Sequence, residues 1–97
     1  MYTERTRMFD LKPPLRLAIA LLLCHEEAYT AAGVHAALLP QYTGERQFTL
    51  QALEEHLQAL KAVGIVRIAE EHLDEAGTLI QSYALTPYGR SRINAFS

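Results

Sequence analysis

The sequence predicts a mostly α-helical domain with one small β-hairpin, in the order helix, helix, helix, strand, strand, helix. Three observations lead to this fold class. Apolar residues recur at helical spacing between residues 15 and 23. A second apolar stripe runs through residues 48–64 and ends at a glycine, as helices commonly do. Residues 65–85 are rich in branched residues around an acidic turn containing Gly77, which is typical of a hairpin.

Size and composition fit one domain. The chain has 97 residues, of which 49% are apolar, enough for one compact core. We expect residues 1–12 to form a polar N-terminal arm and residues 13–97 to form a single domain. The one cysteine, Cys24, excludes an internal disulfide and suits a reducing cytoplasm. Its apolar run, residues 17–24, is shorter than the ~20 residues that a membrane-spanning helix needs.

The first two helices are marked by prolines and a threonine. The first is expected at roughly Pro14 to Glu26, because proline is tolerated in the first turn of a helix. The second is expected at roughly Ala31 to Leu39. Thr30 is a suitable N-cap for it, and Pro40 should end it because proline cannot continue a helix.

The third helix is expected at roughly Leu50 to Val63, with Thr49 as its N-cap. Gly64 should follow it in the left-handed conformation that glycine adopts at helix ends. Four leucines at helical spacing should form its buried stripe: Leu50, Leu53, Leu57 and Leu60. We expect Leu57 to be fully buried where this helix meets the first one.

The hairpin and a short last helix complete the domain. The first strand is expected at Ile65 to Glu71, followed by a turn at Asp74 to Gly77. Alternation in the second strand should place one set of side chains on a single face: Leu79, Gln81, Tyr83 and Leu85. Thr86 followed by Pro87 should begin the last helix, from which Ile93 and Phe96 can pack on the core. A further strand between the first two helices would be too brief to detect.

Two segments in this half of the chain have a familiar spacing. The first is Leu57-Gln58-Ala59-Leu60-Lys61-Ala62-Val63-Gly64-Ile65-Val66, and the second is Tyr83-x-Leu85-Thr86-x-x-Gly89. Together they resemble winged helix-turn-helix regulators of the PadR-like and MarR-like kind. In those proteins a recognition helix ends in a similar leucine and glycine pattern, and a two-stranded wing follows. The resemblance covers roughly the C-terminal half and implies a winged helix-turn-helix fold.

Three features depart from the family pattern. Glu54 occupies a position where PadR-like proteins usually have an aromatic residue. Family wings usually carry arginine or lysine, whereas residues 70–75 here are Glu-Glu-His-Leu-Asp-Glu. The long terminal helices that dimerise many such regulators are missing. A homodimer would therefore form through the N-terminal arm and the short C-terminal helix.

The resemblance implies a small prokaryotic-type transcriptional regulator that binds double-stranded DNA. In this fold the exposed start of the third helix would face the major groove. Glutamine can pair bidentately with adenine, glutamate can accept from cytosine, and arginine or lysine can contact phosphates. The candidate DNA-binding residues are Arg46, Gln47, Thr49, Gln51, Glu55, Gln58, Lys61 and Arg67.

The charge pattern suits a second function, a winged-helix protein-interaction module without DNA binding. The net charge is −2, and carboxylates at the wing tip would repel phosphates. An acidic wing beside a helix face rich in alanine and glutamine suits a basic or neutral protein partner. Three apolar residues of the arm would either dock on that partner or cap the domain's own core: Met8, Phe9 and Leu11.

Metal and enzyme chemistry have weaker support. The possible metal ligands are His25, His35, His56, His72, Cys24, Glu26 and Glu27, and their spacing matches no common metal motif. No nucleophile and base pairing, glycine-rich phosphate loop or carboxylate pair stands out. We therefore expect no enzyme activity, no metal and no cofactor.

Overall fold

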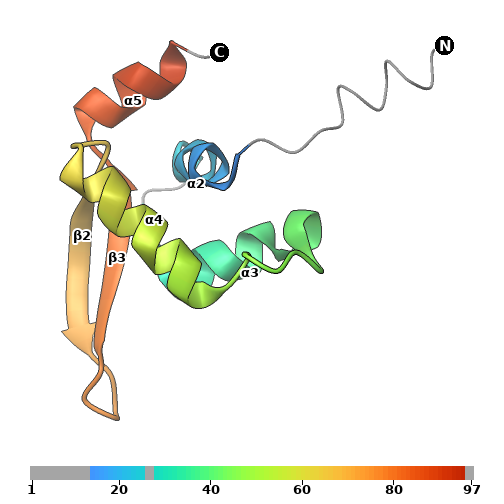
Figure 1. The fold of residues 1–97 in the computed structure, drawn as a ribbon. Coiled ribbons are helices and arrows are strands. Elements are labelled where there is room, and N and C mark those ends of the chain that lie inside the picture. Colours follow the sequence, from blue (N-terminus) through green and yellow to red (C-terminus); the bar gives the residue numbers. More distant parts are fainter. Residues whose placement is uncertain (1–13, 26–27, 96–97) are drawn as a thin grey trace, which may run out of the picture.

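The computed structural model describes residues 14–25 and 28–95, which form four helices and a three-stranded antiparallel sheet (Figure 1). The elements in chain order are α2 (Leu15–Leu23), β1 (Tyr29–Thr30), α3 (Ala31–Tyr42), α4 (Leu50–Ala62), β2 (Val66–Leu73), β3 (Leu79–Leu85) and α5 (Pro87–Asn94). This order differs from the expected one by the short strand β1. The expected N-terminal arm and Phe96 lie outside the described residues.

Helix α2 begins directly after Pro14, and the Pro14 carbonyl accepts from the Ala18 amide at 2.9 Å. One stripe of the helix is buried: Ala18, Ile19, Ala20 and Leu23. The helix ends at Leu23, earlier than the expected end at Glu26. The next amides, of Cys24 and His25, bond to carbonyls only three residues back, so the regular α-helical pattern has already stopped.

Helix α3 starts as expected, because the Thr30 hydroxyl accepts from the Gly33 amide at 3.0 Å. The expected end at Pro40 is wrong, since the helix continues to Tyr42. Pro40 lies in the last turn, on an exposed side of the helix, where its missing N–H removes only one hydrogen bond of the helix. Tyr42 is buried and stacks on Phe48 with ring centroids 5.4 Å apart, which fixes the last turn against the core.

Helix α4 has the expected caps at both ends. The Thr49 hydroxyl accepts from the Ala52 amide at 3.0 Å. After the helix, Gly64 has φ of 83°, and the Ile65 amide bonds to the Leu60 carbonyl at 2.9 Å. The Gly64 amide donates to the Lys61 carbonyl at 3.0 Å, and the two bonds together form a Schellman motif.

The buried stripe of α4 is one leucine shorter than expected. Leu53 and Leu57 are both 0% exposed, and Leu60 is buried as well. Leu50 is 44% exposed, so its expected burial is wrong. It is the first residue of the helix, where the neighbouring elements leave an open groove instead of covering the side chain.

The three strands are ordered β1-β3-β2, so the central strand is β3. Strands β2 and β3 form the hairpin, with Val66 opposite Leu85 and Leu73 opposite Leu79. An irregularity between Ile68 and Glu70 places one extra residue in β2. The hairpin is longer than expected, because β2 continues to Leu73.

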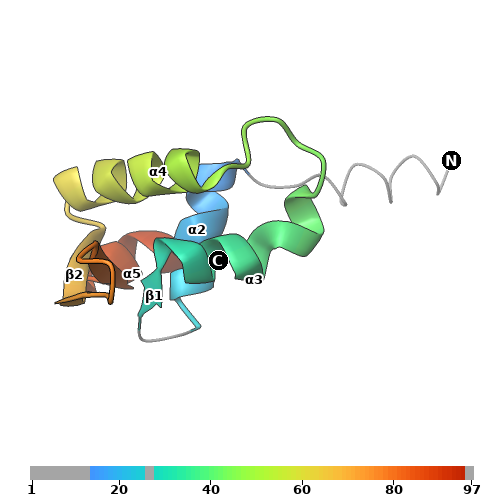
Figure 2. The same ribbon diagram turned by 90° about the horizontal axis from the view of Figure 1, so that it is seen from below.

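The core lies where α2, α3 and α4 meet the base of the sheet (Figure 2). Its largest fully buried side chains are Ile19, Leu23, Val34, Leu53, Leu57 and Val66. The full burial of Leu57 confirms that the leucine stripe of α4 faces the core.

The two segments that resemble the winged helix-turn-helix pattern, residues 57–66 and 83–89, contact one another. The Thr86 amide donates to the Ile65 carbonyl at 2.9 Å, and its hydroxyl donates to the Gly64 carbonyl. The same hydroxyl accepts from the Gly89 amide at 2.8 Å and so caps α5. A side chain at Gly89 would overlap the Ile65 carbonyl oxygen. Thr86 and Gly89 thus hold the start of α5 against Gly64 and Ile65, which follow α4.

Candidate interaction face of helix α4 and the hairpin

The candidate site is the surface made by the exposed side of α4 and the neighbouring hairpin, which we call the α4–wing face. It comprises the exposed residues of Leu50–Ala62 and the hairpin Val66–Leu85. Helix α4 contacts α2, α3 and β2. Figure 1 shows α4 running beside the base of the hairpin, with the hairpin tip extending beyond the helices.

All eight predicted DNA-binding residues are exposed, but they do not form one cluster. Gln47, Thr49 and Glu55 line a groove beside α2, whereas Gln58 lines a different groove beside β3. Arg67 is paired with Ala84. Because side chains alternate along a strand, Arg67 lies on the opposite face of the sheet from Tyr83. Arg46 lies in the loop before α4, and Lys61 lies in its last turn.

Two of these eight side chains already have structural partners. The Thr49 hydroxyl caps α4. The Gln58 side-chain amide donates to the Tyr83 hydroxyl at 2.9 Å, and that hydroxyl donates to the Gln81 side-chain oxygen at 3.3 Å. Gln81 in turn donates to a Glu71 carboxylate oxygen at 3.0 Å. This chain of hydrogen bonds ties α4 to both strands of the hairpin.

The sequence did not reveal this network, although it placed Gln81 and Tyr83 on one strand face. Pairing them with Glu71 requires the register of β2, which the irregularity after Ile68 shifts by one residue. The contact with Gln58 requires the packing angle of α4. Neither quantity follows from local spacing.

The α4–wing face is strongly acidic. Between residues 50 and 79 the chain has six carboxylates and two cations, a balance of −4. All eight charged groups are exposed: Glu54, Glu55, Glu70, Glu71, Asp74, Glu75, Lys61 and Arg67. Asp74 has a structural role as well, because its carboxylate accepts from the Ala76 and Thr78 amides and holds the turn.

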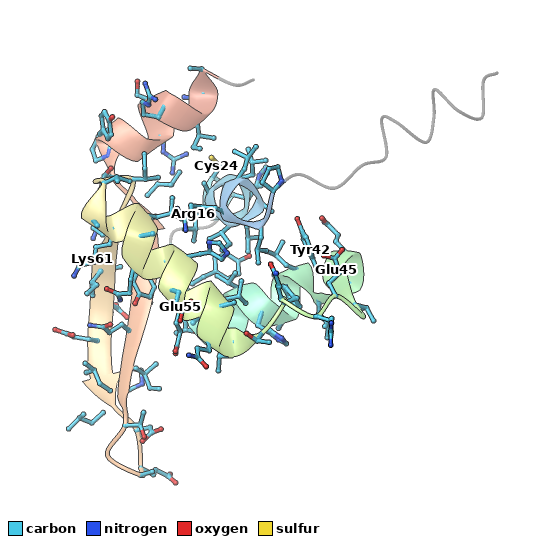
Figure 3. The ribbon with its side chains drawn as sticks, in the orientation of Figure 1. Arg16, Cys24, Tyr42, Glu45, Glu55 and Lys61 are labelled. Carbon is cyan, nitrogen blue, oxygen red and sulfur yellow. The ribbon has the colours of Figure 1, made fainter. Side chains whose placement is uncertain are left out.

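A first groove, of about 760 Å³, lies between the start of α2 and the start of α4. Arg16 lies on the side of α2 that faces α4 (Figure 3), and its Nε donates to Nδ1 of His56 at 3.0 Å. Burial lowers the pKa of His56 below its ordinary value of 6.5. The nearby Arg16 charge lowers it further, while Glu55 opposes the change. Burial also raises the pKa of Tyr42, which lines the same groove.

A second groove, of about 370 Å³, lies between the start of α3, the start of α4 and strand β3. We call it the leucine groove, because Leu50 and Leu79 both line it and are 44% and 52% exposed. Leu73 is opposite Leu79 in the hairpin and is 66% exposed. This groove was not predicted from the sequence. A signal was present in Leu73 and Leu79, which flank the acidic turn, at positions where a solvated hairpin tip would need no apolar residue.

Other kinds of site find little support in the described ranges. No group of three or more histidine, cysteine, aspartate or glutamate side chains within residues 14–25 and 28–95 could hold a metal ion. Glu26 and Glu27, two of the possible ligands, lie outside those ranges. In the same part of the chain, no helix has the length and hydropathy that crossing a bilayer would require.

Comparison with protein-family models gives no match to this sequence, and comparison with curated proteins gives none either.

Proposed function

We propose that the chain is a winged-helix domain that binds another protein through its α4–wing face. Support for this fold comes from a short strand between the first two helices and a two-stranded hairpin directly after α4. The sheet order β1-β3-β2 and the caps at Thr49 and Gly64 agree with it. A fold of this kind hosts many functions, so the function must be argued from the exposed face.

The main observation behind this proposal is the negative charge of the α4–wing face. Of the six carboxylates and two cations, Glu70 and Arg67 lie on the far face of the sheet, which leaves five carboxylates and one cation. This excess would oppose the approach of DNA, because backbone phosphate contacts supply much of the affinity of DNA-binding proteins. The remaining cation, Lys61, lies at the end of α4. A protein partner with basic groups would be attracted by the same carboxylates.

The exposed leucines add independent support. Leu50, Leu73 and Leu79 are each more than 40% exposed, and two of them line one groove. Apolar side chains gathered on a surface and surrounded by polar groups commonly mark a protein-binding site. A DNA backbone offers nothing that would bury them.

A direct test is binding of the purified chain to a mixed-sequence DNA duplex, measured by fluorescence anisotropy at low and at higher salt. We expect no binding under either condition. Binding that falls steeply with salt would overturn the proposal, because that dependence is the signature of phosphate contacts.

DNA binding by a homodimer is the second candidate, and the exposed side chains at the start of α4 favour it. Arg46, Gln47 and Gln51 all lie within the first turn of that helix or the loop before it, where a major groove would meet them. On this alternative, Gln51→Ala would change the preference at one base pair by about 1–3 kcal/mol. Unchanged DNA affinity in a variant that combines Gln51→Ala with Arg46→Ala would exclude it.

A further inference from the structure

We propose that the leucine groove is the docking site for a basic, extended polypeptide segment that carries apolar and cationic side chains at every second position. The inference rests on the proposed protein-binding function and names the partner's chemistry. The apolar side chains would enter between Leu50 and Leu79, and the cations would face Glu54 and Glu71. The groove's shape, its charge and the free edge of a strand each support this assignment.

The walls of the groove come from three elements. Thr30, Ala31 and Ala32 form the side made by the start of α3, and these small residues keep the groove open. Leu50, Glu54 and Gln58 form the side made by α4, and Leu79 to Gln81 with Tyr83 form the side made by β3. The volume of about 370 Å³ is at the small end of the range for binding pockets, which suits a few side chains of a peptide.

The groove has an apolar strip that is open to a partner. Leu50 and Leu79 project into the groove with 44% and 52% of their surface exposed. Leu73 lies directly across the hairpin from Leu79, on the same face of the sheet, and extends the apolar strip toward the turn. A partner that covers this strip would remove apolar surface from water, which is favourable at about 25 cal/mol per Å².

The rim of the groove selects for positive charge. Glu54 lines the groove directly, and Glu71 is positioned beside it by the hydrogen bond from Gln81. No arginine, lysine or histidine is among the described residues that line the groove. A cationic side chain arriving there would meet two carboxylates without a competing cation on the groove wall.

Strand β3 offers a free edge at the groove. Strand β1 pairs with β3 only at Ser82 and Tyr83, because β1 ends where α3 begins. Within residues 14–25 and 28–95, the same edge of Leu79–Gln81 therefore has no strand beside it. An extended peptide can add to such an edge through main-chain hydrogen bonds while alternate side chains enter a neighbouring pocket. Because the groove, Glu54 and Glu71 lie on the same side of the sheet, this geometry favours a segment whose apolar and basic residues both occupy every second position.

The test uses the isotope-labelled 97-residue chain and two blocked synthetic peptides, Lys-Ser-Leu-Ser-Lys and Glu-Ser-Leu-Ser-Glu, with binding followed by two-dimensional amide NMR. We expect the basic peptide to shift the amides of Leu79–Gln81 and of the first turn of α4, and to lose affinity as salt is added. The acidic peptide should leave these amides unchanged. Shifts scattered over the whole surface, or none at millimolar peptide, would overturn the inference.

Matched variants separate the groove from the acidic surface in general. A variant that combines Glu54→Gln with Glu71→Gln should weaken binding of the basic peptide by about threefold to tenfold. Glu70→Gln with Glu75→Gln is the control, because it removes the same charge while Glu70 lies on the opposite face of the sheet. Leu79→Ser should weaken binding, whereas Val63→Ser, at an exposed apolar position that does not line the groove, should not. Equal losses in variants and controls would overturn the site.

Other ligands bound in the leucine groove would give different results in the same NMR experiment. A second copy of the chain in the groove would shift the same amides on dilution of the protein alone, and that result would overturn the inference. A DNA duplex that shifts them would instead overturn the proposed function. Failure of the peptide to engage the groove, with no DNA binding, overturns the docking site and leaves the protein-binding function to be placed elsewhere on the face.

Discussion

At the scale of single residues, His56 makes stability depend on pH. Burial and the Arg16 charge lower the pKa of His56 in the folded chain, so the unfolded chain takes up a proton first as the pH falls. We expect the free energy of unfolding to decrease as the pH drops below the ordinary value of 6.5, down to the lowered pKa. Above 6.5 the contribution of this group is fully present and constant.

Urea unfolding at about pH 7.5 and about pH 5.5 measures this effect, since histidine changes charge in that range. His56→Gln should reduce the loss of stability between the two pH values. His25→Gln is the matched control, because His25 is exposed. If both variants kept the pH dependence of the parent chain, the bond between Arg16 and His56 would have no part in it.

Gly89 is the residue with the least room for change. A side chain there would overlap the carbonyl of Ile65, which is also held by the Thr86 amide. We expect Gly89→Ala to lower the free energy of unfolding by about 1–3 kcal/mol or more, as overpacked sites do. Ser91→Ala, at an exposed position in the same helix, should change it by less than about 0.5 kcal/mol. A Gly89→Ala chain as stable as the parent would show that α5 can move away from the end of α4.

At the scale of elements, α4 contains its own comparison between a core leucine and a surface leucine. Leu57 is 0% exposed and should lose about 2–5 kcal/mol of stability on change to alanine. Leu50, in the same helix and with the same chemistry, borders the leucine groove and should lose less than about 1 kcal/mol. Chemical denaturation of the two variants measures both values. Similar losses at the two positions would mean that the groove is closed in solution.

The elements also show which structural features can be predicted from neighbouring residues in the sequence. Thr30, Thr49 and Thr86 were recognisable as helix caps, because each cap bond depends on residues three positions apart. Gly64 was recognisable for the same reason. Local rules failed at Pro40, where burial of Tyr42 holds the last turn in place, and at Leu50, where the covering elements end.

The leucine groove and the Gln58 network could not be predicted from these rules. They depend on residues far apart in the sequence that the fold brings together. Gln58 bonds to Tyr83, and Ala31 and Leu79 line the same groove. The short strand β1 determines where the edge of β3 is left free, and two residues give no usable pattern. Packing angle and strand register, which only the folded chain defines, set these features.

At the scale of the whole molecule, the uneven charge distribution is the main argument about function. The net charge of −2 is the result of a strongly acidic segment, residues 50–79, and excess positive charge after it, at Arg90 and Arg92. A neutralised variant tests whether the acid excludes DNA. Changing Glu54, Glu70, Glu71 and Glu75 to glutamine moves the net charge from −2 to +2, since each change removes one negative charge.

We expect this variant to gain weak, salt-dependent binding to a mixed-sequence duplex that the parent chain lacks, because long-range repulsion is removed. Anisotropy titrations of the two proteins at the same low salt concentration provide the measurement. A parent chain that binds DNA as well as the variant does would show that these four carboxylates do not decide the partner.

The most direct test of the central claim places both classes of ligand against one labelled sample of the parent chain. Amide spectra would be recorded with the mixed-sequence duplex and then with the basic peptide, at the same low salt concentration. We expect the peptide, and not the duplex, to shift the amides of the α4–wing face. Shifts of that face by the duplex alone would contradict protein binding and assign the surface to DNA.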